Sequence, residues 1–100
     1  MLVARQVFQA RYGRGDELVA LFQELNARMR EADETASPFR ILTDATGPFF
    51  TVVTESEVEN FAAWEEGFGE AMAQPWMGEW FSRMMPLVES GIREFYNLVE

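Results

Sequence analysis

The chain has 100 residues, of which 48% are hydrophobic and 25% charged, a balance typical of one small globular domain. We therefore treat residues 1–100 as a single domain. The sequence contains no cysteine, no histidine and no lysine. These absences exclude disulfides, thiolate nucleophiles, histidine-ligated zinc or haem and lysine Schiff bases, so we expect neither a metal nor a cofactor.

The charge balance is strongly acidic and unevenly distributed. Eight arginines against 17 acidic residues give a net charge of −9, and residues 31–100 carry all of the negative excess. Such a surface repels phosphate backbones and anionic lipids, so we expect neither nucleic acid nor a membrane as a partner. No apolar run approaches the roughly 20 residues of a membrane span, and Arg5 comes too early for a secretory leader. A cytoplasmic location is the expectation.

The first half of the chain predicts a strand, a helix and a hairpin. Residues 2–12 interleave apolar and polar side chains before a glycine-containing turn, which is typical of a strand. Residues 16–32 carry apolar side chains at helical spacing behind an acidic first turn. Residues 38–45 alternate along the run, and the apolar run of residues 49–55 follows Gly47-Pro48, which indicates a β-hairpin around this turn.

A second amphipathic helix is predicted next. Ser56–Glu59 has the S-x-x-E form of a capping box, which favours a helix start at this point. The apolar stripe behind it consists of Phe61, Trp64, Phe68 and Met72. Gly67 and Gly69 interrupt the pattern, because each costs roughly 1 kcal/mol relative to alanine inside a helix. We expect the helix to end or kink there, or its backbone to approach another group closely.

The remainder predicts a short helix and a closing strand. Pro75 fits the first position of a helix that Pro86 ends, and this helix is apolar around most of its girth. A helix of this kind is buried on more than one side. Residues 87–100 contain Gly91 and paired apolar and aromatic residues, which favour a strand over a continued helix.

The resulting order, β-α-β-β-α-(α)-β, predicts an α+β, ferredoxin-like fold with a four-stranded antiparallel sheet and helices on one face. Both faces of at least three strands read as apolar, so the uncovered face is expected to be apolar as well. A second copy is the simplest cover, which predicts a homodimer through the open sheet face. Polar residues on the first strand are expected to pair across that dimer with acidic ones: Arg5, Gln9 and Arg11 with Glu55, Glu89 or Glu94.

Several phrases of the sequence resemble a known group of proteins. The helix DELVALFQEL, the hairpin GPFFTVVTE, the helix ENFAAWEE and the closing REFYNLVE are similar to the dimeric α+β barrel superfamily. Within it, the chain is most similar to uncharacterised bacterial proteins near the antibiotic biosynthesis monooxygenase and NIPSNAP families. The resemblance implies a homodimer with facing sheets and a cleft between sheet and helices in each subunit. It also covers haem enzymes, from which this chain departs by having no histidine.

Three residues are candidates for catalysis. Asn60 and Trp64 lie four apart on one side of the second helix, and the resemblance implies that such a pair holds a phenol or quinone near dioxygen. A packed tryptophan beside an exposed asparagine is the ordinary alternative. Arg83 could anchor an anionic or phenolate ligand, or form a surface ion pair with a neighbouring glutamate.

Four residues are candidates for ligand binding: Trp64, Trp76, Trp80 and Met84. Flat indoles and flexible thioethers adapt to planar guests, although core packing explains the same residues. The leading hypothesis is a homodimer that binds a small apolar or aromatic molecule in the helix–sheet cleft. The alternatives are a cofactor-independent monooxygenase acting on a phenolic or quinone-like substrate, and a purely structural or interaction module.

Overall fold

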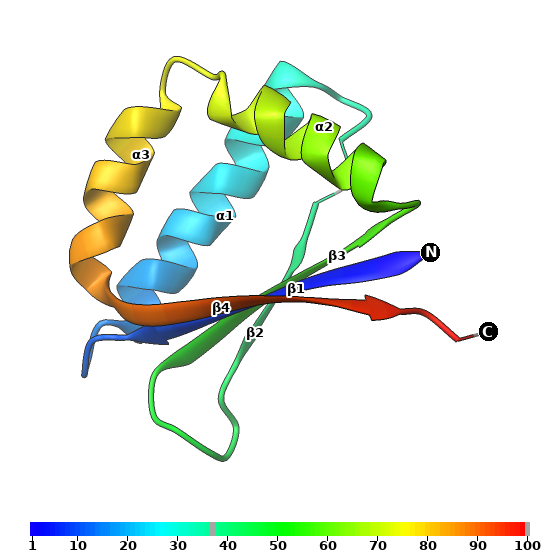
Figure 1. Cartoon of the computed structure of the whole chain (residues 1–100). Coiled ribbons are helices and arrows are strands. Elements are labelled where there is room, and N and C mark those ends of the chain that lie inside the picture. The colour runs from blue at the N-terminus through cyan, green and yellow to red at the C-terminus, as the bar shows by residue number, and fades with distance from the viewer. Residues whose placement is uncertain (37, 100) are drawn as a thin grey trace.

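A four-stranded antiparallel sheet forms one layer of the protein, and helices form the other (Figure 1). The computed structural model describes residues 1–36 and 38–99. Along the sheet the strands follow the order β2 (Arg40–Thr43), β3 (Thr51–Val58), β1 (Leu2–Ala10) and β4 (Val88–Asn97). Both β1 and β3 lie inside the sheet, and β2 and β4 are its edges. This order and these directions confirm the expected α+β, ferredoxin-like fold.

Three helices cover one face of this sheet (Figure 1). The longest, α1 (Gly15–Ala32), lies beside α3 (Met77–Met84), and a 3₁₀ turn, η1 (Met85–Leu87), leads from α3 into β4. Helix α2 (Phe61–Met72) follows β3 and lies near the end of the sheet that carries both termini (Figure 1). Among the described residues, no helix combines the length and apolar character that crossing a membrane requires.

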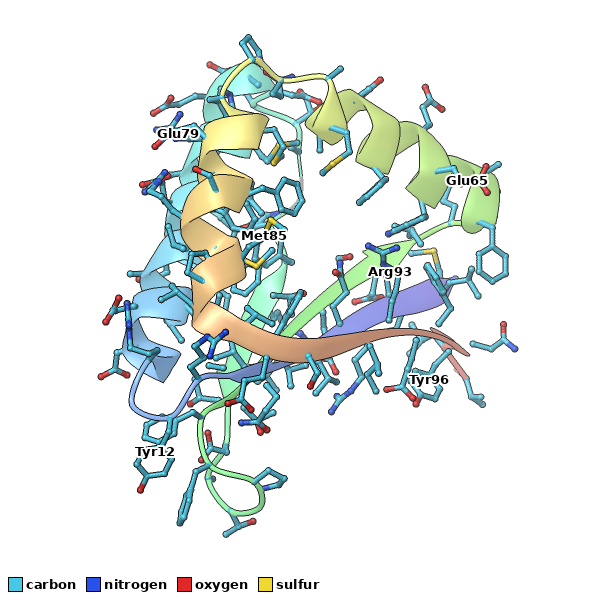
Figure 2. All side chains as sticks on the ribbon, turned by 60° about the vertical axis from the view of Figure 1, so that its left-hand side comes forward. Tyr12, Glu65, Glu79, Met85, Arg93 and Tyr96 are labelled. Atoms are coloured by element: carbon cyan, nitrogen blue, oxygen red, sulfur yellow. The ribbon has the colours of Figure 1, made fainter. Side chains whose placement is uncertain are left out.

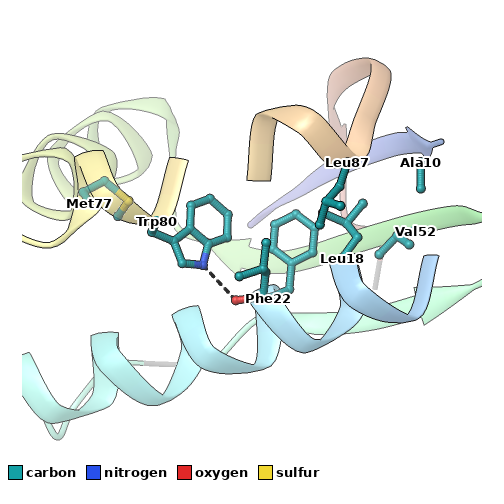
Figure 3. Close-up of a cluster of buried hydrophobic side chains, with 8 residues drawn as sticks. Ala10, Leu18, Phe22, Val52, Met77, Trp80 and Leu87 are labelled. Carbon is teal, nitrogen blue, oxygen red and sulfur yellow. Dashed lines mark hydrogen bonds between the residues drawn. The ribbon is translucent and has the colours of Figure 1, made fainter. Parts of the chain in front are cut away.

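The core lies between α1, α3 and the sheet (Figure 3). Leu18 and Phe22 of α1 are buried against Val52 of β3, and Phe22 stacks at a tilt on Trp80 of α3, with 5.6 Å between ring centroids. The Trp80 side chain is 2% exposed, and its indole N–H donates a hydrogen bond to the Leu21 carbonyl at 2.9 Å. A buried indole needs such a partner, so this contact fixes the position of α3 on α1.

Several predicted strand boundaries shift in the structure. The first strand ends at Ala10 instead of residue 12, β2 covers Arg40–Thr43 instead of 38–45, and β3 covers Thr51–Val58 instead of 49–55. Phe49 and Phe50 lie in the turn before β3, where Phe50 has a φ of 59°. The closing strand is confirmed over Val88–Asn97, and residues 98–99 lie beyond it. The alternation of apolar residues does not mark these ends, because the same residue types continue into the turns.

The predicted start of the second helix is wrong. Strand β3 runs through Ser56 to Val58, so the S-x-x-E sequence is extended, and the helix starts at Phe61 with Asn60 as its cap. The expectation for the two glycines is also wrong. Helix α2 continues through Gly67 and Gly69, and a Cβ added at either would meet nothing within 4 Å. Both glycines face open space, so no close approach explains them.

The third helix also differs from its prediction. Helix α3 begins at Met77, two residues after Pro75, and Pro86 lies within the 3₁₀ turn that continues the helix to Leu87. A proline early in a new turn costs no hydrogen bond, because the first N–H groups of a turn are unpaired in any case. Pro86 therefore changes the kind of helix without ending the helical path.

The open face of the sheet is less apolar than expected. The strand register places one apolar row across it, formed by Leu42, Val53, Val7 and Ile92. The next row on the same face consists of four charged residues: Arg40, Glu55, Arg5 and Glu94. The expectation of an apolar second face rested in part on Phe49, Phe50 and residues 98–99, which lie outside the strands.

Truncating Trp80 tests whether the α1–α3 contact holds the core together. We expect Trp80→Ala to lower the free energy of unfolding by about 3–5 kcal/mol, because it removes a fully buried ring and leaves a cavity. Trp80→Phe keeps a ring at this position and is expected to lose less. Urea unfolding followed by circular dichroism measures both, and a loss below about 1 kcal/mol for Trp80→Ala would contradict this picture.

Candidate functional site

Helix α2 covers the sheet without burying any of its own residues, all of which the structure describes. Two of its rings, Phe61 and Trp64, meet Phe95 of β4 edge-on at centroid distances of 4.9 and 5.1 Å. The Asn60 side-chain oxygen accepts a hydrogen bond from the Ala63 backbone N–H at 2.8 Å and so caps the helix. The helix is thus positioned by a local cap and by one aromatic residue of the sheet.

A guanidinium group lies against the aromatic side chains of α2. The Cζ atom of Arg93, on β4, lies 4.7 Å from the ring centroid of Trp64 and 5.0 Å from that of Phe68. These two rings stack on each other at 4.9 Å with only 17° between their planes. Figure 2 shows Arg93 on the helix side of β4 and Tyr96 on the opposite side. Among the described residues, no carboxylate forms an ion pair with Arg93.

Polar side chains continue from Arg93 across the helix-facing side of the sheet. The register aligns Arg93 with Gln6 of β1 and Gln6 with Thr54 of β3, and residues in register share a face. Thr54 is the one buried polar residue of the described chain, two positions from Val52 of the core. A hydroxyl, an amide and a guanidinium therefore line up on the helix-facing side of the sheet, and the guanidinium lies against α2.

This arrangement suits a flat molecule that carries a negative or polar group. The indole and phenyl faces of α2 offer stacking surfaces, and the guanidinium can pair with a carboxylate or phenolate through two parallel N–H groups. The amide and hydroxyl can each exchange hydrogen bonds with a further substituent. We call Gln6, Thr54, Trp64, Phe68 and Arg93 the α2–sheet cluster.

The candidates on and before α3 belong to a different part of the molecule. Trp80 lies in the core, and Met84 packs against the same buried cluster. Trp76 is half-buried, and its ring lies 5.2 Å from the Cζ of Arg28 on α1. Trp76 and Trp80 contact α1 and Met84 packs against the core, whereas Trp64 contacts Phe95 and Arg93 of β4.

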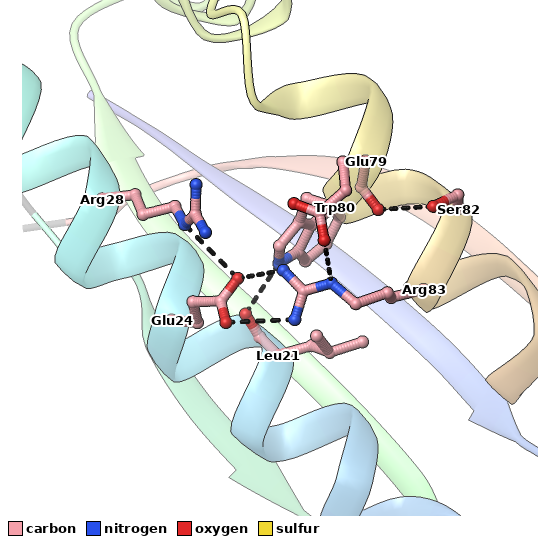
Figure 4. A network of polar contacts seen from close by, with 7 residues as sticks. All are labelled: Leu21, Glu24, Arg28, Glu79, Trp80, Ser82 and Arg83. Atoms are coloured by element: carbon pink, nitrogen blue, oxygen red, sulfur yellow. Dashed lines mark hydrogen bonds and ion pairs between the residues drawn. The ribbon is translucent and has the colours of Figure 1, made fainter.

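Arg83 lies in a network of ion pairs between α1 and α3 (Figure 4). Its guanidinium pairs with both carboxylate oxygens of Glu24, one of them at 3.1 Å, and its Nε lies 2.9 Å from Glu79. Arg28 reaches the same Glu24 carboxylate at 3.4 Å. The hydrogen bonds from Arg83 lower the pKa of Glu24 below its ordinary value. Arg83 therefore takes the second of its two predicted roles, an ion pair with glutamate.

Open hollows on the described surface lie elsewhere, and two of them are well formed enough to compare with the candidates. One, of about 620 Å³, lies at the end of α1 and is lined by Asn26, Arg30, Glu31 and Pro38 among others. The other, of about 210 Å³, lies between the start of α1 and the hairpin. None of the candidate residues lines either hollow. Within the described chain, no three acidic, histidine or cysteine side chains gather closely enough to hold a metal ion.

Of the five residues of the α2–sheet cluster, only Trp64 was predicted from the sequence as a site residue. The other four were not. The sequence did offer a signal for Arg93. It alternates with Gly91 and Phe95 along the closing strand, so it shares their face of the sheet. A single cation on a helix-facing strand position needs a partner. Gln6 and Thr54 carried no such signal, since their alignment with Arg93 depends on strand register.

The fold resembles those of several solved structures. An uncharacterized NIPSNAP domain protein from Burkholderia xenovorans is 17% identical with a TM-score of 0.81, covering 99% of this chain and 95% of that one. A NIPSNAP family protein from Agrobacterium tumefaciens is 15% identical with a TM-score of 0.83, covering 99% and 93%. A putative antibiotic biosynthesis monooxygenase from Nitrosomonas europaea is 11% identical with a TM-score of 0.73, covering all of both chains.

These structures confirm the resemblance expected from the sequence at the level of the fold. No protein-family model matches the chain, and no curated protein matches it. The chain therefore has the ferredoxin-like α+β fold seen in these NIPSNAP proteins and in the putative antibiotic biosynthesis monooxygenase.

The Glu24–Arg83 pair predicts a pH dependence of stability. Because the folded protein lowers the pKa of Glu24, the pair stabilises the fold at neutral pH and loses this effect as Glu24 is protonated in acid. We expect the free energy of unfolding to fall more steeply between about pH 6 and pH 3 in the wild type than in Glu24→Gln. Urea unfolding across this range measures both slopes, and equal slopes would show that the pair contributes nothing.

Proposed function

We propose that the protein is a homodimer in which each protomer binds a small planar aromatic molecule at the α2–sheet cluster. The observation that carries this proposal is the guanidinium of Arg93, held over two stacked rings and without a carboxylate partner among the described residues. A cation in this position stabilises the rings only modestly, by about 0.5–1 kcal/mol at an exposed site. An anionic ligand would add a stronger, charge-assisted pair.

The weak coverage of α2 supports binding at this position. Phe61, Phe68 and Met72 all remain exposed on a helix that buries none of its described residues. Binding sites draw on segments of low local stability, because the segment must move to admit the ligand. A ligand ring between α2 and β4 would cover the apolar surface that the helix leaves in solvent.

In this proposal the other predicted site residues stabilise the fold and do not contact the ligand. Trp80 and Arg83 connect α3 to α1, Trp76 lies over Arg28 of α1, and Met84 packs against the core. A ligand reaching Trp80 would therefore have to separate two packed helices. The oxygenase alternative needs Asn60 as a polar contact for the substrate, but its side-chain oxygen already caps α2. This use of Asn60 favours binding over oxygenation.

The open sheet face supports the homodimer. An apolar row of Leu42, Val53, Val7 and Ile92 crosses all four strands on the side away from the helices. Ile92 and Leu42, on the two edge strands, are exposed. A second copy placed on this face would cover the row, as closed twofold interfaces do in most small oligomers.

Ligand binding can be tested with an aromatic carboxylate and its neutral alcohol. We expect 2-naphthoate to quench tryptophan fluorescence saturably, and Arg93→Met to weaken its binding about tenfold or more, because the charge-assisted pair is lost while the apolar stem remains. The alcohol is expected to bind both proteins equally.

Arg30→Met is the matched control, since Arg30 is exposed in the last turn of α1, far along the chain from the cluster. It is expected to bind 2-naphthoate like the wild type. Absence of saturable quenching in the wild type would contradict the proposed function and favour a purely structural module. Equal affinities of wild type and Arg93→Met would remove Arg93 from the site.

A further inference from the structure

The polar residues of the α2–sheet cluster form one row on the helix-facing side of the sheet. In register from the edge inward, the row reads Arg93 on β4, Gln6 on β1 and Thr54 on β3. The next row on the same face, two residues along each strand, contains Phe8 and Val52 of the core region. A sheet face covered by helices is ordinarily apolar, so the polar row calls for an explanation.

The three side chains of this row make no hydrogen bond to any described residue. On the opposite face of the same strands, by contrast, Arg5 donates to Glu55 across the β1–β3 ladder at 2.6 Å. A polar group buried without a partner lowers the free energy of unfolding. A row of such groups therefore indicates a role other than stability.

Exposure to solvent falls along the row from the edge inward. Arg93 is exposed, Gln6 is half-buried, and Thr54 is only 5% exposed. The Thr54 hydroxyl is nevertheless not among the side-chain atoms that are closed off from solvent without a partner. It therefore borders space that a ligand atom can enter. The row has an outer end at Arg93 and an inner end at Thr54.

The two ends of the row differ in charge. Arg93 supplies a positive charge at the exposed end, where an anionic group keeps part of its hydration. Gln6 and Thr54 offer only neutral donors and acceptors. A second anion at the inner end would lose its water without gaining a cation, which is strongly unfavourable. An apolar group there would leave the amide and the hydroxyl unpaired.

We propose that Gln6 and Thr54 select a planar aromatic monoacid whose opposite end carries a neutral hydrogen-bonding group. The acid group pairs with Arg93 at the outer end, and the neutral group exchanges hydrogen bonds with Gln6 and Thr54. Neighbouring strands lie about 4.8 Å apart, so Arg93 and Thr54 are two such spacings apart, a length suited to a ligand of two fused rings. This inference rests on binding at the α2–sheet cluster, as in the proposed function, and specifies the class of ligand.

Three related ligands test the inference by isothermal titration calorimetry. We expect the wild type to bind 6-hydroxy-2-naphthoate about five- to tenfold more tightly than 2-naphthoate, because only the hydroxyl compound pairs with the inner residues. The dianion 2,6-naphthalenedicarboxylate is expected to bind no more tightly than 2-naphthoate. In the double variant Gln6→Met/Thr54→Val, 6-hydroxy-2-naphthoate and 2-naphthoate are expected to bind equally, because both inner partners are gone.

A matched control makes the same substitution in the neighbouring row. Thr43→Val changes an exposed threonine of the edge strand β2, opposite Val52, and is expected to keep the preference for the hydroxyl compound. Urea unfolding checks that each variant folds. Thr54→Val is expected to be at least as stable as the wild type, because it removes an unpaired, buried hydroxyl. If the double variant fails to fold, Gln6→Met replaces it, and a reduced preference is expected.

The outcomes separate this inference from the proposed function. Failure of the wild type to bind either monoacid would overturn the proposed function and the inference together. Equal, saturable binding of both monoacids would retain binding at the cluster and overturn selection by the inner residues. A preference that persists in the double variant, or tighter binding of the dicarboxylate than of 2-naphthoate, would also overturn that selection. A preference lost in the double variant and kept in Thr43→Val would support it.

Discussion

The contact between Trp80 and Leu21 holds α3 on α1 and so divides the helical layer into a packed pair, α1 and α3, and a separate helix, α2. The hydrogen bond between Trp80 and Leu21 is buried. Before and after Trp80 in the chain, Trp76 contacts Arg28 of α1 and Arg83 pairs with Glu24 of α1. On α1 these partners lie at spacings of three and four residues, which places them on one side of the helix. The pairs connect α3 to α1 along most of the length of α3, and η1 then fixes the start of β4.

Helix α2 lies outside this packed pair of helices. Helix α2 has no comparable helical partner among the described residues, since its aromatic rings contact Phe95 of β4 and each other. On the sheet, α2 contacts the guanidinium of Arg93 as well as the ring of Phe95, whereas the sheet residues that pack against α1 and α3 are apolar. The same fold therefore contains a tightly packed half that gives stability and a loosely covered half with chemistry suited to a ligand. The proposed site follows from this contrast in packing.

The two faces of the sheet divide the proposed roles in the same way. Successive residues of β4 point to opposite faces, so Arg93 lies toward the helices and Glu94 toward the open face. One strand therefore contributes to the α2–sheet cluster and to the row of four charged residues on the open face. A ligand on one face and a second copy on the other would both act on β4. The edge position of this strand places both features where a second molecule can reach them.

Much of the fold could be predicted from the sequence. Apolar periodicity predicted the order of the elements, and the resemblance named families whose solved structures have the same fold. The helix start was missed because Ser56–Glu59 satisfies a capping pattern while its pairing with β1 holds it extended. The site was mostly missed for the same reason. Gln6, Thr54 and Arg93 come together through strand register, which depends on long-range pairing and not on local spacing.

Hydrogen exchange in the protein without ligand tests the division of the helical layer most directly. Amide exchange rates report local opening, which is governed by the packing of each element. The account predicts that the amides of residues 61–72 in α2 exchange markedly faster than those in the central turns of α1 and in α3. Protection of α2 equal to that of α1 and α3 would contradict the account, because α2 would then be as firmly packed as they are.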